Sequence, residues 1–272
     1  MTDEDLLERA AAAAFKALQV KARSEHGGNT QPLLVVYAVE AFLRRLASSE
    51  HAERMVLKGG MLLAANDIRR LTRDADLSTH GVPGDEDNVR QLVTAICAIQ
   101  PEPHDGVTID PVTIRTERMR EGDEYQGVRC KLVATLGKAQ IPFALDLSFG
   151  DPKRVTVIQL ESVIDQPAVR LRAYPLALNL AEKIVTAMQR RETNTRDRDF
   201  ADLWSPAERI DSTPPNSASM YRQSPIIAGN RSSRWRKRWH TCQTASNPTR
   251  RWSPACPTCR RPRNTGENWS TG

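Results

Sequence analysis

The chain has few of the features that a secreted or membrane protein needs. It holds five cysteines, and only Cys97 and Cys130, far apart in sequence, precede residue 205. The N-terminus, residues 1–5, is acidic where a secretory signal is basic and then apolar, and no apolar run is long enough to cross a bilayer. We therefore expect a cytoplasmic protein with neither a disulfide framework nor a membrane anchor.

Residues 205–272 lack the side chains that build a hydrophobic core. This segment contains no Leu, Val or Phe, but eight of the seventeen Pro and four of the five Trp. We therefore expect a disordered or loosely attached basic tail. It carries twelve basic residues against three acidic ones, a charge of +9 within the overall +6, so residues 1–204 are left at −3. The basic character of the chain belongs to the tail.

Three interpretations of this tail stay open. The first is a reading frame that shifts near codon 204, which would leave the C-terminal helical part truncated. The second is an RNA-binding tail, in which residues 234–239 (RWRKRW) combine positive charge with stacking rings. The third is a small zinc site, since two residues separate the last two of its candidate ligands, as in zinc knuckles. Those candidates are His240, Cys242, Cys256 and Cys259.

The chain is organised around residues 58–78, in which a Gly-Gly pair is followed by thirteen residues and then by Asp-Ala-Asp. An apolar run, residues 55–57, precedes Gly59 and Gly60, and an apolar segment, residues 61–65, follows them. This order predicts a strand, a turn and a helix. Glycine permits close approach by another group, and the backbone N–H groups of such a turn suit a phosphate. A plain tight turn is the alternative.

Three acids form the second half of the predicted site. Asp74 and Asp76 are two residues apart on a predicted strand, so their carboxylates point to the same side. Two like charges this close require a cation or raise each other's pKa, and Mg²⁺ takes carboxylate oxygens together with substrate phosphates. Asp146 lies within an apolar run, residues 143–148. An acid there needs a metal or a salt bridge, and both explanations stay open.

Hydrophobic periodicity predicts the remaining elements. Helices are expected at residues 3–24, 33–48 and 88–99 and from Tyr174-Pro175 onward, with Thr2 as the cap of the first. Strands are expected at residues 108–119, 128–136 and 142–148, with a short extended piece at 165–172. Together with the Asp74 strand these form a mixed or antiparallel sheet flanked by helices, in fold class α/β (α+β). The expected divisions are 1–50 (N-terminal helices), 51–172 (core), 173–204 (helical segment) and 205–272 (tail).

Four motifs occur in a fixed order. They are Lys58-Gly59-Gly60, residues 70–77 (RLTRDADL), residues 181–184 (AEKI) and residues 196–203 (RDRDFADL). The Gly-Gly pair, the two acids and the later apolar-Asp-apolar strand resemble the nucleotidyltransferase superfamily related to DNA polymerase β. The ordered set resembles the AbiEii/AbiGii toxin family, which includes the MenT-like toxins. The resemblance covers about residues 30–204 and implies a nucleotidyltransferase (polymerase β-like) fold.

The resemblance also implies a function. It implies a toxin of a toxin-antitoxin or phage-defence system that transfers a nucleotide from an NTP to RNA, in particular to the 3′ end of tRNA, and so blocks translation. The implied cofactor is Mg²⁺, and the implied partner is an AbiEi-type antitoxin. One alternative is a catalytically inactive, truncated member of the family that binds nucleotide, antitoxin or RNA. Another is an RNA-binding protein that acts through its tail.

The family's functional residues can be placed on this chain one by one. Gly59 and Gly60 would hold the triphosphate, and Asp74 and Asp76 would hold Mg²⁺ with Asp146 as a third acid. Lys183 would reach the phosphates as a point charge. The other matching positions are the acid of the last motif, Asp199, and the nucleotide-binding neighbours Lys58, Thr72 and Arg196. Catalysis would consist of positioning and charge neutralisation.

Overall fold

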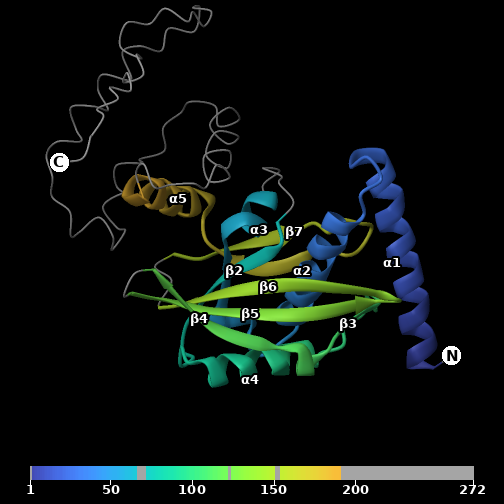
Figure 1. Ribbon diagram of the computed structural model, residues 1–272, viewed down its shortest axis with the longest axis horizontal. Helices are drawn as coiled ribbons and strands as arrows, with labels where there is room; N and C mark the ends of the chain where they lie inside the picture. The colour runs from blue at the N-terminus through green and yellow to red at the C-terminus, as the bar shows by residue number, and fades with distance from the viewer. Residues whose placement is uncertain (1, 66–71, 122–123, 151–153, 191–272) are drawn as a thin grey trace, which may run out of the picture. The chain divides into compact units, whose positions relative to one another are not determined.

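The computed structural model describes residues 2–65, 72–121, 124–150 and 154–190. These residues form one mixed sheet of eight strands with helices on both sides (Figure 1). The predicted fold class, a mixed sheet flanked by helices, is confirmed.

The helices begin and end close to the predicted positions. The first starts at the predicted cap, where the Asp5 N–H donates to Thr2 Oγ1 at 3.2 Å and the Thr2 N–H donates to the Asp5 carboxylate at 2.8 Å. No helix in the described residues is long and apolar enough to cross a membrane. The helices are α1 (Asp3–Glu25), α2 (Gln31–Ala47), α3 (Gly59–Ala64), α4 (Glu86–Cys97) and α5 (Leu176–Arg190).

The sheet has the strand order β3-β5-β6-β2-β1-β8-β7, and β4 pairs with β5 outside this path. Its central strands run in mixed directions, since β2 is parallel to β6 and antiparallel to β1. The strands are β1 (Met55–Lys58), β2 (Asp74–Thr79), β3 (Val107–Ile109), β4 (Arg115–Glu121), β5 (Glu124–Leu136), β6 (Ala139–Phe149), β7 (Thr156–Leu160) and β8 (Val169–Ala173).

One prediction about strands is wrong, and one strand was not predicted. The single strand expected at residues 108–119 is two strands, β3 and β4, separated by a 3-10 turn at Pro111–Thr113. Proline has no N–H for the ladder, and the side chain of Asp110 caps the turn instead. Strand β7 was not predicted. The extended piece expected at residues 165–172 is confirmed as β8, to which β7 is antiparallel.

The two-residue period of the strands separates the two faces of the sheet. Cys130, Leu145 and Leu77 are buried on the face that α2 and α4 cover, and α2 and α4 also contact each other. Most of the residues that alternate with them on β5, β6 and β2 are at least partly accessible on the opposite face, although Ser78 is buried. All three predicted acids lie on this second face.

Helix α2 forms the centre of the core, and every residue from 33 to 46 is buried. Its charged residues are paired within the protein. Arg45 donates to the Asp105 carboxylate at 2.8 Å, and the Glu40 carboxylate accepts from Ser162 Oγ at 2.6 Å and from the Val163 N–H at 3.0 Å. These contacts fix the loops around residues 105 and 162 to the helix beneath the sheet.

Candidate active site

The three predicted acids come together on neighbouring strands. In the parallel pairing of β2 with β6, Asp76 lies opposite Asp146, and in the antiparallel pairing with β1 it lies opposite Lys58. Asp74 is two residues before Asp76 on the same face of β2 and pairs with Ala144. Asp76 and Asp146, 70 positions apart in the chain (146 − 76), are thereby placed side by side on the accessible face.

The Gly-Gly turn borders these acids. Strand β1 ends at Lys58 and helix α3 begins at Gly59, which confirms the predicted strand, turn and helix. Gly59 has a φ of +66°, and a Cβ atom there would lie 1.8 Å from Asp76 Oδ2. Both the backbone conformation and the contact with Asp76 therefore require glycine at this position.

Asn179 of α5 binds the backbone of the same glycine. The Gly59 N–H donates to Asn179 Oδ1 at 2.7 Å, and Asn179 Nδ2 donates to the Gly59 carbonyl at 3.1 Å. This side chain is 2% exposed. The structure thus differs from the predicted phosphate cradle in two respects, because the Gly59 N–H donates to Asn179 and the Gly60 N–H donates to the Asp76 carboxylate.

Lys183 follows Asn179 by four residues in α5. Residues at this spacing share a helix face, so Lys183 projects from the side of α5 that contacts the Gly59 turn. Lys183 is half-buried. Lys183 therefore lies on the side of α5 that faces Gly59, one turn of the helix after Asn179.

The acids interact electrostatically. Burial, and then the negative charges of Asp74 and Asp146, raise the pKa of Asp76 to about 6, against the smaller opposing effects of Lys58 and the Gly60 N–H. Asp74 accepts a hydrogen bond at 2.9 Å from Thr72 Oγ1, which fixes its orientation. A bound cation would remove the cost of ionising Asp76.

Lys58 links the acids to helix α5. Its Nζ lies 6.0 Å from the centre of the Tyr174 ring, and its charge lowers the pKa of both Asp76 and Glu182. Burial has the larger effect on Glu182 and leaves its pKa raised. The predicted nucleotide-binding lysine is thus close to one acid of the sheet and one of the helix.

Arg129 is a member of the site that the sequence analysis missed. It lies opposite Asp146 in the antiparallel pair of β5 and β6. Its Nε donates to Asp146 Oδ1 at 2.7 Å and its Nη2 donates to Oδ2 at 2.6 Å, while Nη2 is 3.9 Å from Asp74 Oδ2. Of the two explanations left open for Asp146, the structure therefore contains the salt bridge.

The donor set suits a hard divalent cation. Asp74 and Asp76 offer adjacent carboxylates, Gly59 allows the Asp76 carboxylate to pack against the backbone of the turn, and oxygen ligands are those that Mg²⁺ prefers. Within the described ranges, no group of three or more His, Cys, Asp or Glu side chains is arranged to hold a metal ion. The residues present fit a cation held by the two acids of β2, with water completing its coordination in the absence of substrate.

Two predicted site residues, Arg196 and Asp199, lie outside the described residues. The same is true of the tail and of its candidate zinc ligands. Their roles stay predictions.

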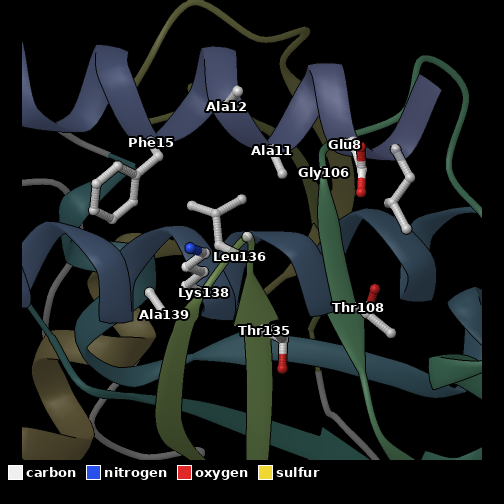
Figure 2. A pocket seen from close by; sticks show the side chains of 12 residues that line it. Glu8, Ala11, Ala12, Phe15, Gly106, Thr108, Thr135, Leu136, Lys138 and Ala139 are labelled. Atoms are coloured by element: carbon white, nitrogen blue, oxygen red, sulfur yellow. The ribbon is translucent and has the colours of Figure 1, made fainter. Parts of the chain in front are cut away.

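A cavity of about 610 Å³ lies apart from this site. It separates α1 from the turn between β5 and β6, and Figure 2 shows Ala11 and Phe15 of α1 above Leu136. Its lining is mostly apolar and includes none of the predicted site residues.

Comparisons with known proteins identify a family. The family model for "Nucleotidyl transferase AbiEii toxin, Type IV TA system" matches residues 41–223, and no curated protein sequence matches the chain. The chain is similar to the solved structure of JHP933 from Helicobacter pylori, with 18% identity, a TM-score of 0.47, and 71% of this chain and 73% of that chain covered. It is also similar to MenT4, a nucleotidyltransferase toxin from Mycobacterium tuberculosis, with 14% identity, a TM-score of 0.42, and 89% and 94% covered. Because both TM-scores are low, the family assignment rests on the family model.

Proposed function

The chain belongs to the AbiEii nucleotidyltransferase toxin family, and from this premise we propose that it transfers a nucleotide from an NTP to RNA, with the 3′ end of tRNA as the acceptor. Such a transfer would block translation. Membership of the family implies a nucleotide substrate and an antitoxin partner. We propose an AbiEi-type antitoxin as that partner, and a cytoplasmic location stays a prediction.

One observation carries the proposal. The register of β1, β2 and β6 brings Lys58, Asp76 and Asp146 side by side, next to a turn at which only glycine fits. Adjacent carboxylates can hold a metal ion, and two lysines beside a backbone turn can bind the phosphates. Together these groups have the composition needed to hold a metal-bound triphosphate.

Each residue has a role in this proposal. Asp74 and Asp76 would hold Mg²⁺, with Asp146 as the third acid of the site and Thr72 orienting Asp74. The metal would neutralise charge on the phosphates as the bond to the leaving pyrophosphate breaks. The turn at Gly59 and Gly60 would give the triphosphate a close approach without side chains in the way.

The two lysines would act from opposite sides. Lys58 extends from the end of β1 and Lys183 from α5, and both would contact phosphate oxygens as point charges. Asp199 and Arg196, from the last motif, would complete the nucleotide site. Most of the rate enhancement would come from positioning the acceptor and the α-phosphate rather than from a covalent step on the protein.

The acceptor can be tested with chemically modified RNA. Purified protein, Mg²⁺ and α-labelled NTPs are incubated with total tRNA, and in parallel with tRNA whose 3′-terminal ribose has been oxidised with periodate. Label is expected only on the intact tRNA, because oxidation destroys the 3′ hydroxyl. Equal labelling of both would rule out the 3′ end as acceptor. Nucleotide binding without any transfer would instead support the inactive, ligand-binding alternative.

A further inference from the structure

We propose that Arg129 is a positioning residue that acts as a built-in cation at Asp146, so that the divalent cation is taken by Asp74 and Asp76 alone. This inference rests on the proposed function, because it concerns the same metal-dependent site. Nothing in the four sequence motifs points to Arg129, which lies between the second and third of them.

The geometry of the pair leaves Asp146 little capacity for another cation. Both of its oxygens accept from the same guanidinium, at 2.7 Å and 2.6 Å. These are the short distances of charge-assisted hydrogen bonds, and the planar fork of arginine matches both oxygens at once. A metal at Asp146 would have to share both oxygens with the guanidinium, and the repulsion between two cations at such short range disfavours it.

Other acids hold Arg129 in this position. Its Nη2 lies 3.9 Å from Asp74 Oδ2, and Glu117 of β4 lies directly opposite it in the antiparallel pair of β4 and β5. An arginine guanidinium stays charged in proteins. This one lies beside acids on three strands, Asp74 of β2, Glu117 of β4 and Asp146 of β6.

The charges agree with a single divalent ion. Asp74, Asp76 and Asp146 carry three negative charges. Arg129 contributes one positive charge at Asp146, and Lys58, opposite Asp76, contributes another, so these five side chains have a net charge of −1. This is too little negative charge for two divalent ions. Arg129 neutralises the acid on β6, and one divalent ion neutralises the two acids on β2. The two cationic groups then lie side by side across the strands, each with its own carboxylates.

The experiment measures Mn²⁺ binding to the full-length protein without nucleotide or RNA, from the loss of the free Mn²⁺ signal in electron paramagnetic resonance. The wild-type protein should bind one Mn²⁺, and Asp76→Asn should weaken binding at least tenfold. Arg129→Gln should bind Mn²⁺ at least tenfold more tightly or take up a second ion, because Asp146 becomes available. Arg129→Lys, which keeps the charge without the fork, should lie between wild type and Arg129→Gln.

The decisive variant is the double substitution Arg129→Gln with Asp146→Asn. If Arg129 keeps Asp146 from the metal, removing both should leave the Mn²⁺ affinity within threefold of wild type. A loss of tenfold or more would overturn the inference, because Asp146 would then be a ligand in the wild-type protein. If the double variant fails to fold, Arg129→Gln alone provides the test. Weaker Mn²⁺ binding by Arg129→Gln than by wild type would then overturn the inference.

The same data separate this inference from the proposed function. If Asp76→Asn weakens Mn²⁺ binding but the double variant weakens it as much, the metal site stands and only the role of Arg129 is wrong. If wild type does not bind Mn²⁺, or if Asp76→Asn binds as wild type does, the metal site on β2 is wrong, and the role of Arg129 is wrong with it.

Discussion

Asn179 satisfies both backbone hydrogen-bonding groups of Gly59, at 2.7 Å to the N–H and 3.1 Å to the carbonyl, across 120 residues of sequence. One buried side chain thus ties α5, which carries Lys183, to the turn that borders Asp76. The two halves of the proposed site, one on the sheet and one on the helix, are held in register by this contact.

Asn179→Ala should lower both stability and nucleotide transfer. It removes two hydrogen bonds worth about 1 kcal/mol each and leaves the Gly59 N–H buried without its partner, so unfolding free energy should fall by about 2 kcal/mol. Urea denaturation measures this fall, and initial rates of NTP transfer measure the loss of alignment. Thr186→Ala is the matched control, because it also removes a side-chain hydrogen bond from α5. The Thr186 hydroxyl donates to the Glu182 carbonyl within the same helix and not to the Gly59 turn. If the two variants behave alike, Asn179 has no special role.

Gly59→Ala should damage the site more than a glycine substitution elsewhere. The new Cβ would lie 1.8 Å from Asp76 Oδ2, at a φ of +66°, so the carboxylate must move. Gly28→Ala is the matched control, since Gly28 has a φ of +84° with nothing within 4 Å of the added atom. The control should cost about 1–2 kcal/mol of backbone strain.

Thermal unfolding and Mn²⁺ titration of the two variants provide the comparison. Gly59→Ala should unfold at a lower temperature than Gly28→Ala and should lose Mn²⁺ affinity, whereas Gly28→Ala should keep it. Equal Mn²⁺ affinity in both variants would show that Asp76 does not depend on the space beside Gly59.

The stability of the metal-free protein should fall as pH rises through the range in which Asp76 ionises. The pKa of Asp76 is about 6 in the folded protein against an ordinary value of 3.8, so the folded state binds this proton more tightly than the unfolded state. Unfolding free energy should therefore decrease between about pH 4 and pH 6, by something on the order of 2 kcal/mol for this half-buried group.

Denaturation curves at several pH values, recorded with a chelator, measure this dependence. Asp76→Asn should flatten the decrease between pH 4 and pH 6. Added Mg²⁺ at pH 7 should raise the unfolding temperature of wild type and leave that of Asp76→Asn unchanged. A wild-type profile that rises across this range would mean that burial does not disfavour the charged form of Asp76.

The ion pair between Arg45 and Asp105 should be important for folding. Both side chains are almost fully buried, and Asp105 also accepts from Arg44 and from the Val107 N–H. Asp105→Ala should lower unfolding free energy by about 3–5 kcal/mol, because it leaves the buried Arg45 guanidinium without its carboxylate, whereas Arg44 keeps Glu40. Glu25→Ala, which breaks an exposed pair with Lys21 on α1, should cost less than about 1 kcal/mol in the same denaturation experiment. Similar costs would contradict the structural role of the buried pair.

Much of the fold could be predicted because its signals are local. The acidic first turn and cap at Thr2 marked the start of α1, alternation marked β5, and the apolar run around Asp146 marked β6. The break at Pro111 could also have been predicted, since proline has no N–H for a ladder. Strand β7 lies at the edge of the sheet, where most of its side chains are exposed, so its hydrophobic pattern is weak.

Half of the candidate site could be predicted from local sequence, and the rest depends on pairing between distant segments. The contact between Arg129 and Asp146 could have been predicted from the hairpin that joins β5 and β6. Leu136 pairs with Ala139 across a two-residue turn in which Gly137 has a φ of +58°. Counting back along both strands from this turn pairs residue 129 with residue 146. The contact between Asn179 and Gly59 has no such signal, because a helix and a turn 120 residues apart share no register.

The proposed nucleotide transfer is tested most directly by label transfer from α-labelled NTPs to total tRNA, with wild-type protein, with Asp76→Asn, and with Gly28→Ala as the folded control. We expect transfer by wild type and Gly28→Ala and a loss of at least about a hundredfold in Asp76→Asn, which corresponds to about 2.7 kcal/mol of transition-state stabilisation. Undiminished transfer by Asp76→Asn, or no transfer by folded wild-type protein from any NTP, would contradict it.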